Sequence, residues 1–363
     1  MKIRAFITHK LSEYYSDCQD RFGINPDTNS IALSDGMGST WQQKIWAQLL
    51  VDRFVECDDW LPTHDSIKPL CALWREKVIS QIQKLKETST EQISEKKRRE
   101  LDALIYRNER NLAMGRSAGA TFVGIRFDRN KWVGSVLGDS CLVEWNGIKE
   151  IFYTSQSGES FDSYPDYFDS NALREGKGIP KPIEGILSNG TVLLLISDPF
   201  SDFLFEQRKQ GDITSYIQQL LGITSHEEFE SIVEKWRNAG MPNDDTTLII
   251  VENDDADLFT LNNIDNLNLF IDQEKNEKEK EEADTKEIQL SNENKQEDEK
   301  RFASEGPSSS LTQVDEKSFI DEFKILRSSL EKKKKYLHFL KNKDYSVEAL
   351  EILLKKYDVT MYK

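Results

Sequence analysis

The stretch that decides the fold runs from Ala120 to Thr154 and reads ATFVGIRFDRNKWVGSVLGDSCLVEWNGIKEIFYT. It divides into short apolar runs that are rich in β-branched and aromatic residues. Turn signals separate these runs, at Asp128-Arg129-Asn130 and at Asn146-Gly147. Short strands joined by tight hairpins favour an antiparallel sheet. The sequence therefore predicts strands at 120–128, 131–137, 141–145 and 150–154.

Further elements are expected on both sides of this stretch. Apolar runs predict strands at 2–8, 20–25, 29–34, 191–197 and 246–252. Helical periodicity predicts helices at 41–57, 67–85, 94–114, 203–211, 213–221 and 226–239. The helices come in two groups between groups of strands. This order favours sheets with helices packed on their outer faces over a doubly wound βαβ fold.

The composition excludes several classes of protein. The 363 residues carry 48 Lys and Arg against 64 Asp and Glu, a net charge of -16, and 37% of them are hydrophobic. No apolar run approaches the ~20 residues that span a membrane, and the first residues lack the apolar region of a signal peptide. The four cysteines have no CxxC spacing that would indicate a disulfide framework or a zinc site. We expect a cytoplasmic protein with no nucleic-acid or membrane partner.

The acidity is concentrated behind the last predicted strand. Residues 272–300 hold 12 Asp and Glu against 6 Lys and contain no aromatic residue. Such a segment cannot bury enough apolar surface to offset its ordering entropy. We therefore expect a main domain at 1–255, an acidic disordered linker at 256–315 and a C-terminal helical segment at 316–363. An acidic interaction tail is the alternative for the linker, and the C-terminal helices are expected to bind a partner or the main domain.

Aspartates stand where the apolar strands begin or end. Asp35, Asp139 and Asp198 follow such runs, whereas Asp20 and Asp244 precede them. A single aspartate beside glycine is most often a turn residue. Several carboxylates at one end of a sandwich would repel one another unless hard cations such as Mg²⁺ or Mn²⁺ lay between them. The set therefore predicts a divalent-cation site, with solvated turns as the alternative.

Six short motifs occur in an order that resembles a known family. They are Cys18-Gln19-Asp20-Arg21-Phe22, Ser34-Asp35-Gly36-Met37-Gly38-Ser39, Ser117-Ala118-Gly119-Ala120-Thr121, Leu137-Gly138-Asp139-Ser140, Ile196-Ser197-Asp198 and Asn243-Asp244-Asp245-Thr246-Thr247. The series resembles the metal-dependent type 2C (PPM) protein serine/threonine phosphatases, bacterial branch, over roughly residues 1–253. The resemblance implies an α+β fold, a four-layer αββα sandwich of two antiparallel sheets flanked by helices. The predicted C-terminal helices would form an extension to it.

The resemblance also implies a role for each matching site residue. Asp35 would bridge two metal ions, and the carbonyl group of Gly36 would bind one of them. Asp198 and Asp244 would bind the other ion. Asp139 would lie at a weaker third site. The implied cofactors are therefore two Mn²⁺ or Mg²⁺ ions, with a third at Asp139.

The chemistry implied by this family is hydrolysis without a covalent enzyme intermediate. Asp20 would hold a metal-bound water, so Asp20 and Asp35 are the catalytic candidates. Two cations would lower the pKa of a bridging water, which would attack phosphorus in line with the leaving serine or threonine oxygen. The partner would be a phosphorylated protein substrate, and a cognate serine/threonine kinase is a further expected partner.

Three residues depart from the family pattern. Pro199 follows the metal-binding aspartate where relatives normally have glycine, so the turn there must differ. Gln19 stands where many relatives have glutamate, and Tyr15 stands where some have an arginine that holds the substrate phosphate. The candidates to replace that arginine are His9, Lys10 and Arg21.

Three functions are compatible with the sequence. The leading one is a protein-serine/threonine phosphatase (a phosphoric monoester hydrolase) that acts on phosphoserine and phosphothreonine at the two-metal site. A pseudophosphatase that binds or scaffolds phosphoproteins is favoured by Pro199 and the missing arginine, and opposed by the retained aspartates. The third is a metal-dependent hydrolase of small phosphate esters. The polar residues 155–190 lie where the family has a variable flap, which is expected to shape specificity.

Overall fold

The computed structural model describes residues 1–278, apart from 92, 156–165, 172–177, 212 and 254–258. Both sheets lie in one compact unit, Met1–Lys275, and a second unit begins at Asn276. The predicted C-terminal helical segment at 316–363, most of the predicted linker and parts of the predicted flap lie outside the described residues.

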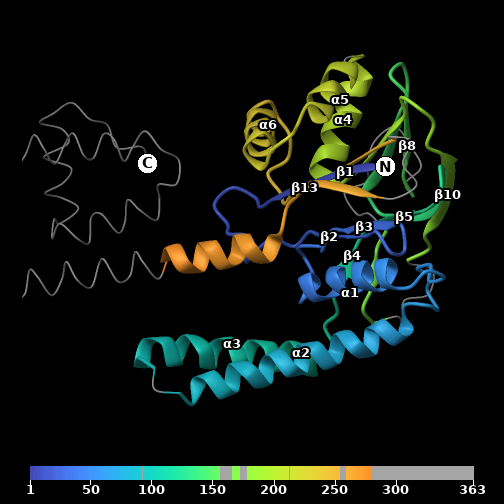
Figure 1. The fold of residues 1–363 in the computed structure, drawn as a ribbon. Helices are drawn as coiled ribbons and strands as arrows, with labels where there is room; N and C mark the ends of the chain where they lie inside the picture. The colour runs from blue at the N-terminus through green and yellow to red at the C-terminus, as the bar shows by residue number, and fades with distance from the viewer. Residues whose placement is uncertain (92, 156–165, 172–177, 212, 254–258, 279–363) are drawn as a thin grey trace, which may run out of the picture. The chain divides into compact units, whose positions relative to one another are not determined.

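Two sheets stack face to face (Figure 1). The first has the strand order β13-β1-β12-β11-β7-β8. Its strands are β1 (Lys2–Thr8), β7 (Cys141–Trp145), β8 (Glu150–Tyr153), β11 (Val192–Ile196), β12 (Thr246–Glu252) and β13 (Thr260–Ile264). The second has the order β10-β6-β5-β3-β2. Its strands are β2 (Arg21–Asn25), β3 (Ser30–Ser34), β5 (Phe122–Asp128), β6 (Lys131–Leu137) and β10 (Lys181–Ile186). A short separate pair consists of β4 (Gly119–Ala120) and β9 (Phe168–Asp169).

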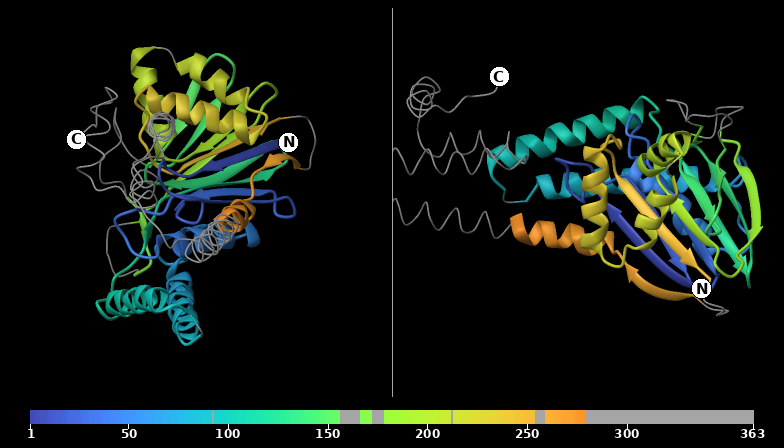
Figure 2. Two further views of the ribbon diagram at one scale, coloured as in Figure 1. Left: turned by 90° about the vertical axis from the view of Figure 1, so that its left-hand side faces the viewer. Right: turned by 90° about the horizontal axis from the view of Figure 1, so that it is seen from above.

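Helices cover the outer faces of both sheets (Figure 2). The helices are α1 (Gln43–Glu56), α2 (Lys68–Ser89), α3 (Glu95–Ala113), α4 (Asp198–Gln210), α5 (Ile213–Leu221) and α6 (His226–Asn238). Apolar side chains of α4, α5 and α6 pack on the first sheet, and those of α1 and α2 pack on the second. No helix in the described part of the chain is long and apolar enough to cross a membrane.

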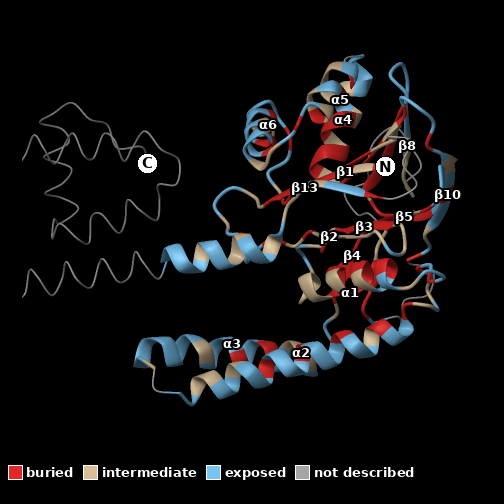
Figure 3. Cartoon of the chain, viewed as in Figure 1, coloured by how far each residue is buried: buried red, intermediate tan, exposed pale blue. Residues whose placement is uncertain are grey.

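The alternation of side chains along β11 explains the layering. Leu193 and Leu195 point into the core between the two sheets, and Leu194 and Ile196 point into the core beneath α4–α6. All four side chains are fully buried, as Figure 3 shows for the sheet interior. A continuous apolar run is what a strand needs when both of its faces are covered. The α+β sandwich predicted from the sequence is confirmed, with helices outside and sheets inside.

Two edge strands differ from the prediction. The disordered linker was expected to begin at residue 256. Instead, residues within it form β13, which pairs in parallel with β1, and residues 267–275 are helical. The boundary at 255 is therefore too early, and this one pair departs from the antiparallel pattern. The run Thr260–Ile264 (TLNNI) has too little apolar alternation to predict a strand, and it gains order from the β1 backbone. The edge strand β10 was missed because it contains Pro182, which is tolerated where one side of a strand is unpaired.

Candidate active site

Four aspartates gather where strands of both sheets end. Asp35 follows β3, Asp139 follows β6 after one glycine, Asp198 follows β11 after one serine, and Asp20 precedes β2. Burial raises the pKa of Asp35 well above its ordinary value, and the charges of Asp198, Asp20 and Asp139 raise it further. The tertiary structure thus places four of the sequence-predicted site residues within electrostatic reach of one another. These four residues are called the carboxylate cluster below.

Asp20 is the buried member of the carboxylate cluster. Its side chain has 0% exposure, and the Thr247 hydroxyl donates a 2.7 Å hydrogen bond to its Oδ2 atom. The backbone N–H of Thr247 donates in turn to the Ser197 hydroxyl at 2.8 Å, so the ends of β11 and β12 fix this carboxylate. Burial raises the pKa of Asp20, and the charge of Asp245 adds to the effect. Its Oδ1 atom is buried and receives no hydrogen bond from a donor among the described residues, and the carboxyl group of Asp35 lies within hydrogen-bonding reach of Asp20.

Asp35 and Gly36 lie in a tight backbone crossing. The N–H of Thr121 donates to the carbonyl of Asp35 at 2.9 Å. A Cβ atom at Gly36 would lie 2.9 Å from Cγ of Gln43 and 3.1 Å from the carbonyl oxygen of Gln19. A side chain at position 36 would therefore crowd the Gln19 loop and displace the side chain of Gln43. Asp35 keeps partial solvent exposure, so a ligand can reach it.

Pro199 is accommodated by an earlier helix start. The sequence predicted a helix from 203, but α4 begins at Asp198 itself, so Pro199 falls in the first turn, where no intrahelical N–H bond is lost. The carboxylate of Asp198 lies at the positive end of the helix dipole. Burial raises its pKa nonetheless, and the charges of Asp139 and Asp20 raise it further. The departure from the family pattern therefore alters the turn but keeps this carboxylate within the carboxylate cluster.

Ser201 connects two members of the cluster and was missed by sequence reasoning. Its hydroxyl lies 2.7 Å from the carbonyl oxygen of Asp139 and 3.0 Å from that of Asp198. Asp202 is a further missed residue: its charge raises the pKa of both Asp139 and Asp198. The helical period could have indicated Asp202, because it is four residues after Asp198 and therefore lies on the same face of α4. The Oδ1 atom of Asp139 has no hydrogen-bond partner within the described residues.

Asp244 is engaged by a cation of the chain itself. The ammonium group of Lys10 lies 3.1 Å from Oδ1 of Asp244. Burial lowers the pKa of Lys10, but the hydrogen bond and charge of Asp244 outweigh this effect and leave the pKa raised. Asp245 is buried and accepts hydrogen bonds from the N–H groups of Lys10 at 3.0 Å and Gln19 at 2.7 Å. Asp245 therefore holds the loop that carries both residues.

The other two phosphate-binding candidates do not enter the cluster. The His9 ring packs edge-on against Tyr15 with centroids 4.6 Å apart, which is a packing role. Arg21 donates to the carbonyl groups of Cys18 at 2.9 Å and Asp20 at 2.6 Å. Arg237, which sequence reasoning missed, donates to the carbonyl of His9 at 3.2 Å and to that of Asp244 at 2.6 Å. Arg237 thus positions the segment before β12 from the end of α6.

The carboxylate cluster offers oxygen atoms, the type of ligand that hard divalent cations take. Among the described residues, none of its four members forms an ion pair with a basic side chain. The same part of the chain holds no group of three or more His, Cys, Asp or Glu side chains placed to hold one ion. Mg²⁺ commonly binds through one or two carboxylates and keeps several of its waters, so a wider spacing of carboxylates fits a hydrated ion. If such an ion were bound, the Oδ1 atoms of Asp20 and Asp139, which receive no hydrogen bond among the described residues, would be acceptors for its waters.

Comparisons with known proteins find structural similarity but no match in sequence. No protein-family model matches the sequence, and no curated protein matches it significantly. One similar solved structure is a bacterial serine phosphatase, with 16% identity, a TM-score of 0.42, and coverage of 68% of this chain and 96% of that one. A second is the catalytic domain of the serine threonine protein phosphatase PstP in complex with two manganese ions, with 15% identity, a TM-score of 0.41, and coverage of 71% and 98%. A third is the serine/threonine phosphatase of S. agalactiae, with 14% identity, a TM-score of 0.39, and coverage of 69% and 100%. These three solved structures are a bacterial serine phosphatase and two serine/threonine phosphatases.

Proposed function

We propose that this protein is a metal-dependent phosphatase that hydrolyses phosphoserine and phosphothreonine in proteins. The observation that carries the proposal is the carboxylate cluster: four aspartates from the ends of both sheets, with raised pKa values for each and no basic partner among the described residues. Such a concentration of negative charge is costly unless cations neutralise it. Divalent cations bound at the carboxylate cluster would relieve this electrostatic cost.

The ligands proposed for the cations are the aspartates of the candidate site that keep partial solvent exposure. Asp35, Asp139, Asp198 and Asp244 all keep partial solvent exposure, whereas Asp20 is buried beneath them. We assign the metal ions, Mn²⁺ or Mg²⁺, to these four carboxylates and to the carbonyl of Gly36, in the roles that the resemblance implies. When bound, such ions lower the pKa of water and neutralise charge on a phosphoryl group.

The chain's own residues orient water and substrate in this proposal. Thr247 fixes one oxygen of Asp20, so the free Oδ1 atom can accept a hydrogen bond from water in a set direction. Ser201 holds the loop of Asp139 against the first turn of α4, and Arg237 holds the loop before β12. These bonds reduce the motion of the carboxylates, and fixed donors and acceptors make up much of enzymatic rate enhancement.

The test is hydrolysis of a phosphothreonine peptide by the full-length protein with Mn²⁺. Turnover is expected, and excess EDTA or Asp35→Asn should abolish it. The matched control is Asp128→Asn, because Asp128 also ends a strand but is exposed at the opposite end of β5. The control should retain wild-type turnover. Turnover that survives both EDTA and Asp35→Asn would refute the metal-dependent mechanism.

A second candidate function is a phosphoprotein-binding module without turnover. The observation that favours it is the ion pair between Lys10 and Asp244, because an internal cation there competes with a metal ion. Binding of the phosphothreonine peptide with no release of phosphate in Mn²⁺ or Mg²⁺ would support this alternative. Hydrolysis of p-nitrophenyl phosphate but of no phosphoprotein would instead support a hydrolase of small phosphate esters.

A further inference from the structure

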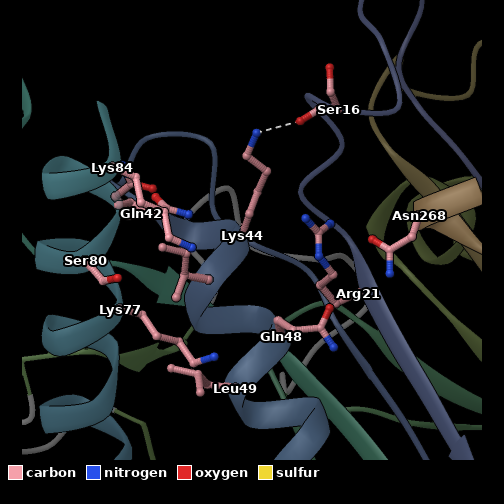
Figure 4. A pocket seen from close by; sticks show the side chains of 12 residues that line it. Ser16, Arg21, Gln42, Lys44, Gln48, Leu49, Lys77, Ser80, Lys84 and Asn268 are labelled. Carbon is pink, nitrogen blue, oxygen red and sulfur yellow. Dashed lines mark hydrogen bonds between the residues drawn. The ribbon is translucent and has the colours of Figure 1, made fainter. Parts of the chain in front are cut away.

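A basic cavity lies beside the candidate active site, between α1, α2 and the loop before β2. It has a volume of about 620 Å³, within the range of small-molecule sites. Figure 4 shows its basic side chains on separate elements: Lys77 and Lys84 on α2, Lys44 on α1, and Arg21 at the start of β2. None of the lining residues, all of which are described, is acidic. The cavity thus gathers four basic side chains and no carboxylate in a chain whose net charge is -16.

Lys44 and Arg21, the two partly buried cations of the cavity, are hydrogen-bonded to backbone carbonyl groups and not to carboxylates. Lys44 donates a 2.8 Å hydrogen bond to the carbonyl of Ser16, the dashed line in Figure 4, and Arg21 donates to backbone carbonyls. Burial lowers the pKa of Lys44; Asp17 opposes this effect, and the positive charge of Arg21 adds to it. Across the described part of the chain, neither residue forms an ion pair. A bound anion would relieve the repulsion between them.

The two exposed lysines of the cavity, Lys77 and Lys84, lie on one face of α2. Lys77 and Lys84 are seven residues apart on α2, which is two helical turns, so they lie on one face with Ser80 between them. Both lysines are exposed, and neither has an ion-pair partner among the residues that the structure describes. Three acidic residues outside the lining act on Arg21, in the order Asp20, Asp245 and Asp52. Asp52 accepts a 2.7 Å hydrogen bond from the amide of Gln48.

We infer that this cavity, lined by Arg21, Lys44, Lys77 and Lys84, is a binding site for a phosphate-bearing ligand with two or more adjacent negative charges. Arginine and lysine together bind phosphate through charge-assisted hydrogen bonds. The polar groups of Ser80 and Gln48 add neutral donors on the same walls. The phosphates are supplied by a multiply phosphorylated peptide or by free polyphosphate. The site is separate from the carboxylate cluster, which without divalent cations would repel the same ligand, and its existence does not depend on the proposed function.

Calorimetric titration of the full-length protein with sodium tripolyphosphate, in EDTA, tests the site. EDTA removes divalent ions, so the carboxylate cluster cannot contribute to binding. Wild-type protein is expected to bind one equivalent, and added salt should weaken binding because charges carry it. The double variant Lys77→Gln, Lys84→Gln should weaken the affinity at least about tenfold, since each lysine supplies a charged hydrogen bond.

The matched control is the double variant Lys96→Gln, Lys97→Gln on α3. It removes the same charge from exposed helical positions outside the cavity and should bind tripolyphosphate like the wild type. Asp35→Asn should also bind normally, which separates this test from that of the phosphatase proposal. Equal affinities for the cavity and control variants, or no binding by the wild type, would overturn the inference.

A second titration identifies the source of the phosphate. A peptide with two adjacent phosphoserines and the same peptide with one are compared at equal ionic strength. Tighter binding of the doubly phosphorylated peptide, lost with Lys77→Gln, Lys84→Gln, assigns the site to phosphorylated protein. Binding of tripolyphosphate but of neither peptide assigns it to a free polyphosphate.

Discussion

The ammonium group of Lys10 lies 3.1 Å from Oδ1 of Asp244, so a basic side chain binds one of the carboxylates assigned to a metal ion. The pair joins the loop after β1 to the residues just before β12, two segments more than two hundred residues apart in the chain. Asp244 keeps a side-chain exposure of 49%, so solvent and ions can still reach it. Lys10 and a divalent cation would therefore compete for the same carboxylate.

Substitution of Lys10 by glutamine is expected to tighten Mn²⁺ binding. The reason is the loss of a competing positive charge, which at partly exposed sites corresponds to about 1 kcal/mol, or several-fold in the dissociation constant. Calorimetric titration with Mn²⁺ measures the change. Lys68→Gln is the control, because it also removes a lysine from an ion pair. Its partner, Asp65, lies 2.6 Å away and is not a member of the candidate site. Unchanged or weaker Mn²⁺ binding by Lys10→Gln would contradict the competition.

The Asp35→Asn variant should respond differently to metal than the wild type. Without divalent ions the variant is expected to melt at the same or a higher temperature, because one charge has been removed from a cluster of like charges. With Mn²⁺ the wild type should gain thermal stability, since a ligand that binds the folded state stabilises it, and the variant should gain little. Differential scanning fluorimetry in EDTA and in Mn²⁺ compares them. An equal gain in both proteins would argue against Asp35 as a ligand.

His226 should make the stability of the protein depend on pH. Its Nδ1 lies 2.8 Å from Oδ2 of Asp265, its Nε2 lies 2.9 Å from the Tyr15 hydroxyl, and Glu230 is 3.4 Å away. Burial lowers the pKa of His226, but the bonds to Asp265 and Glu230 outweigh it and raise the pKa to about 9. The neighbouring Glu227 on α6 is exposed and adds its charge.

The sign of this dependence follows from the raised pKa. The stabilisation by protonated His226 is fully present below the unfolded-state value of about 6.5 and is lost as the pH rises towards 9. The loss is expected to be roughly 1–3 kcal/mol in the free energy of unfolding after allowance for solvent screening. Urea unfolding at pH 6 and pH 9 measures it. His226→Gln should reduce the difference between the two pH values, whereas His64→Gln, beside an exposed aspartate, should leave it unchanged.

Gly134 is a packing requirement in the second sheet. A Cβ atom there would lie 2.0 Å from the carbonyl oxygen of Gly124, a backbone atom that cannot move without breaking the sheet. Gly134→Ala is therefore expected to lower the free energy of unfolding by about 3 kcal/mol or more. Gly222→Ala is the control, because its nearest contacts would be at 3.5 Å and ordinary. Chemical unfolding curves that coincide for the two variants would show that the strand can shift.

Much of the fold was predictable because its strands are local patterns. The predicted bounds of β1, β6, β7 and β12 agree with the structure, and the six predicted helices are all present. Each of those strands carries enough apolar or β-branched residues to be recognised alone. The strands β10 and β13 were not predicted, because Lys181–Ile186 includes a proline and a glycine and Thr260–Ile264 has few apolar residues. Both depend on pairing with a partner distant in sequence.

The candidate site was predictable as a set of residues but not as an arrangement. The sequence by itself determined which aspartates end strands, because strand periodicity and the ordered motifs are local. Only the tertiary structure decided that Asp20 lies buried, that Lys10 binds Asp244, and that α4 begins early enough to accept Pro199. It also decided the basic cavity, whose cations come from α1, α2 and β2. The physical reason is that burial and charge interactions depend on distances between segments remote in the chain, which no local pattern encodes.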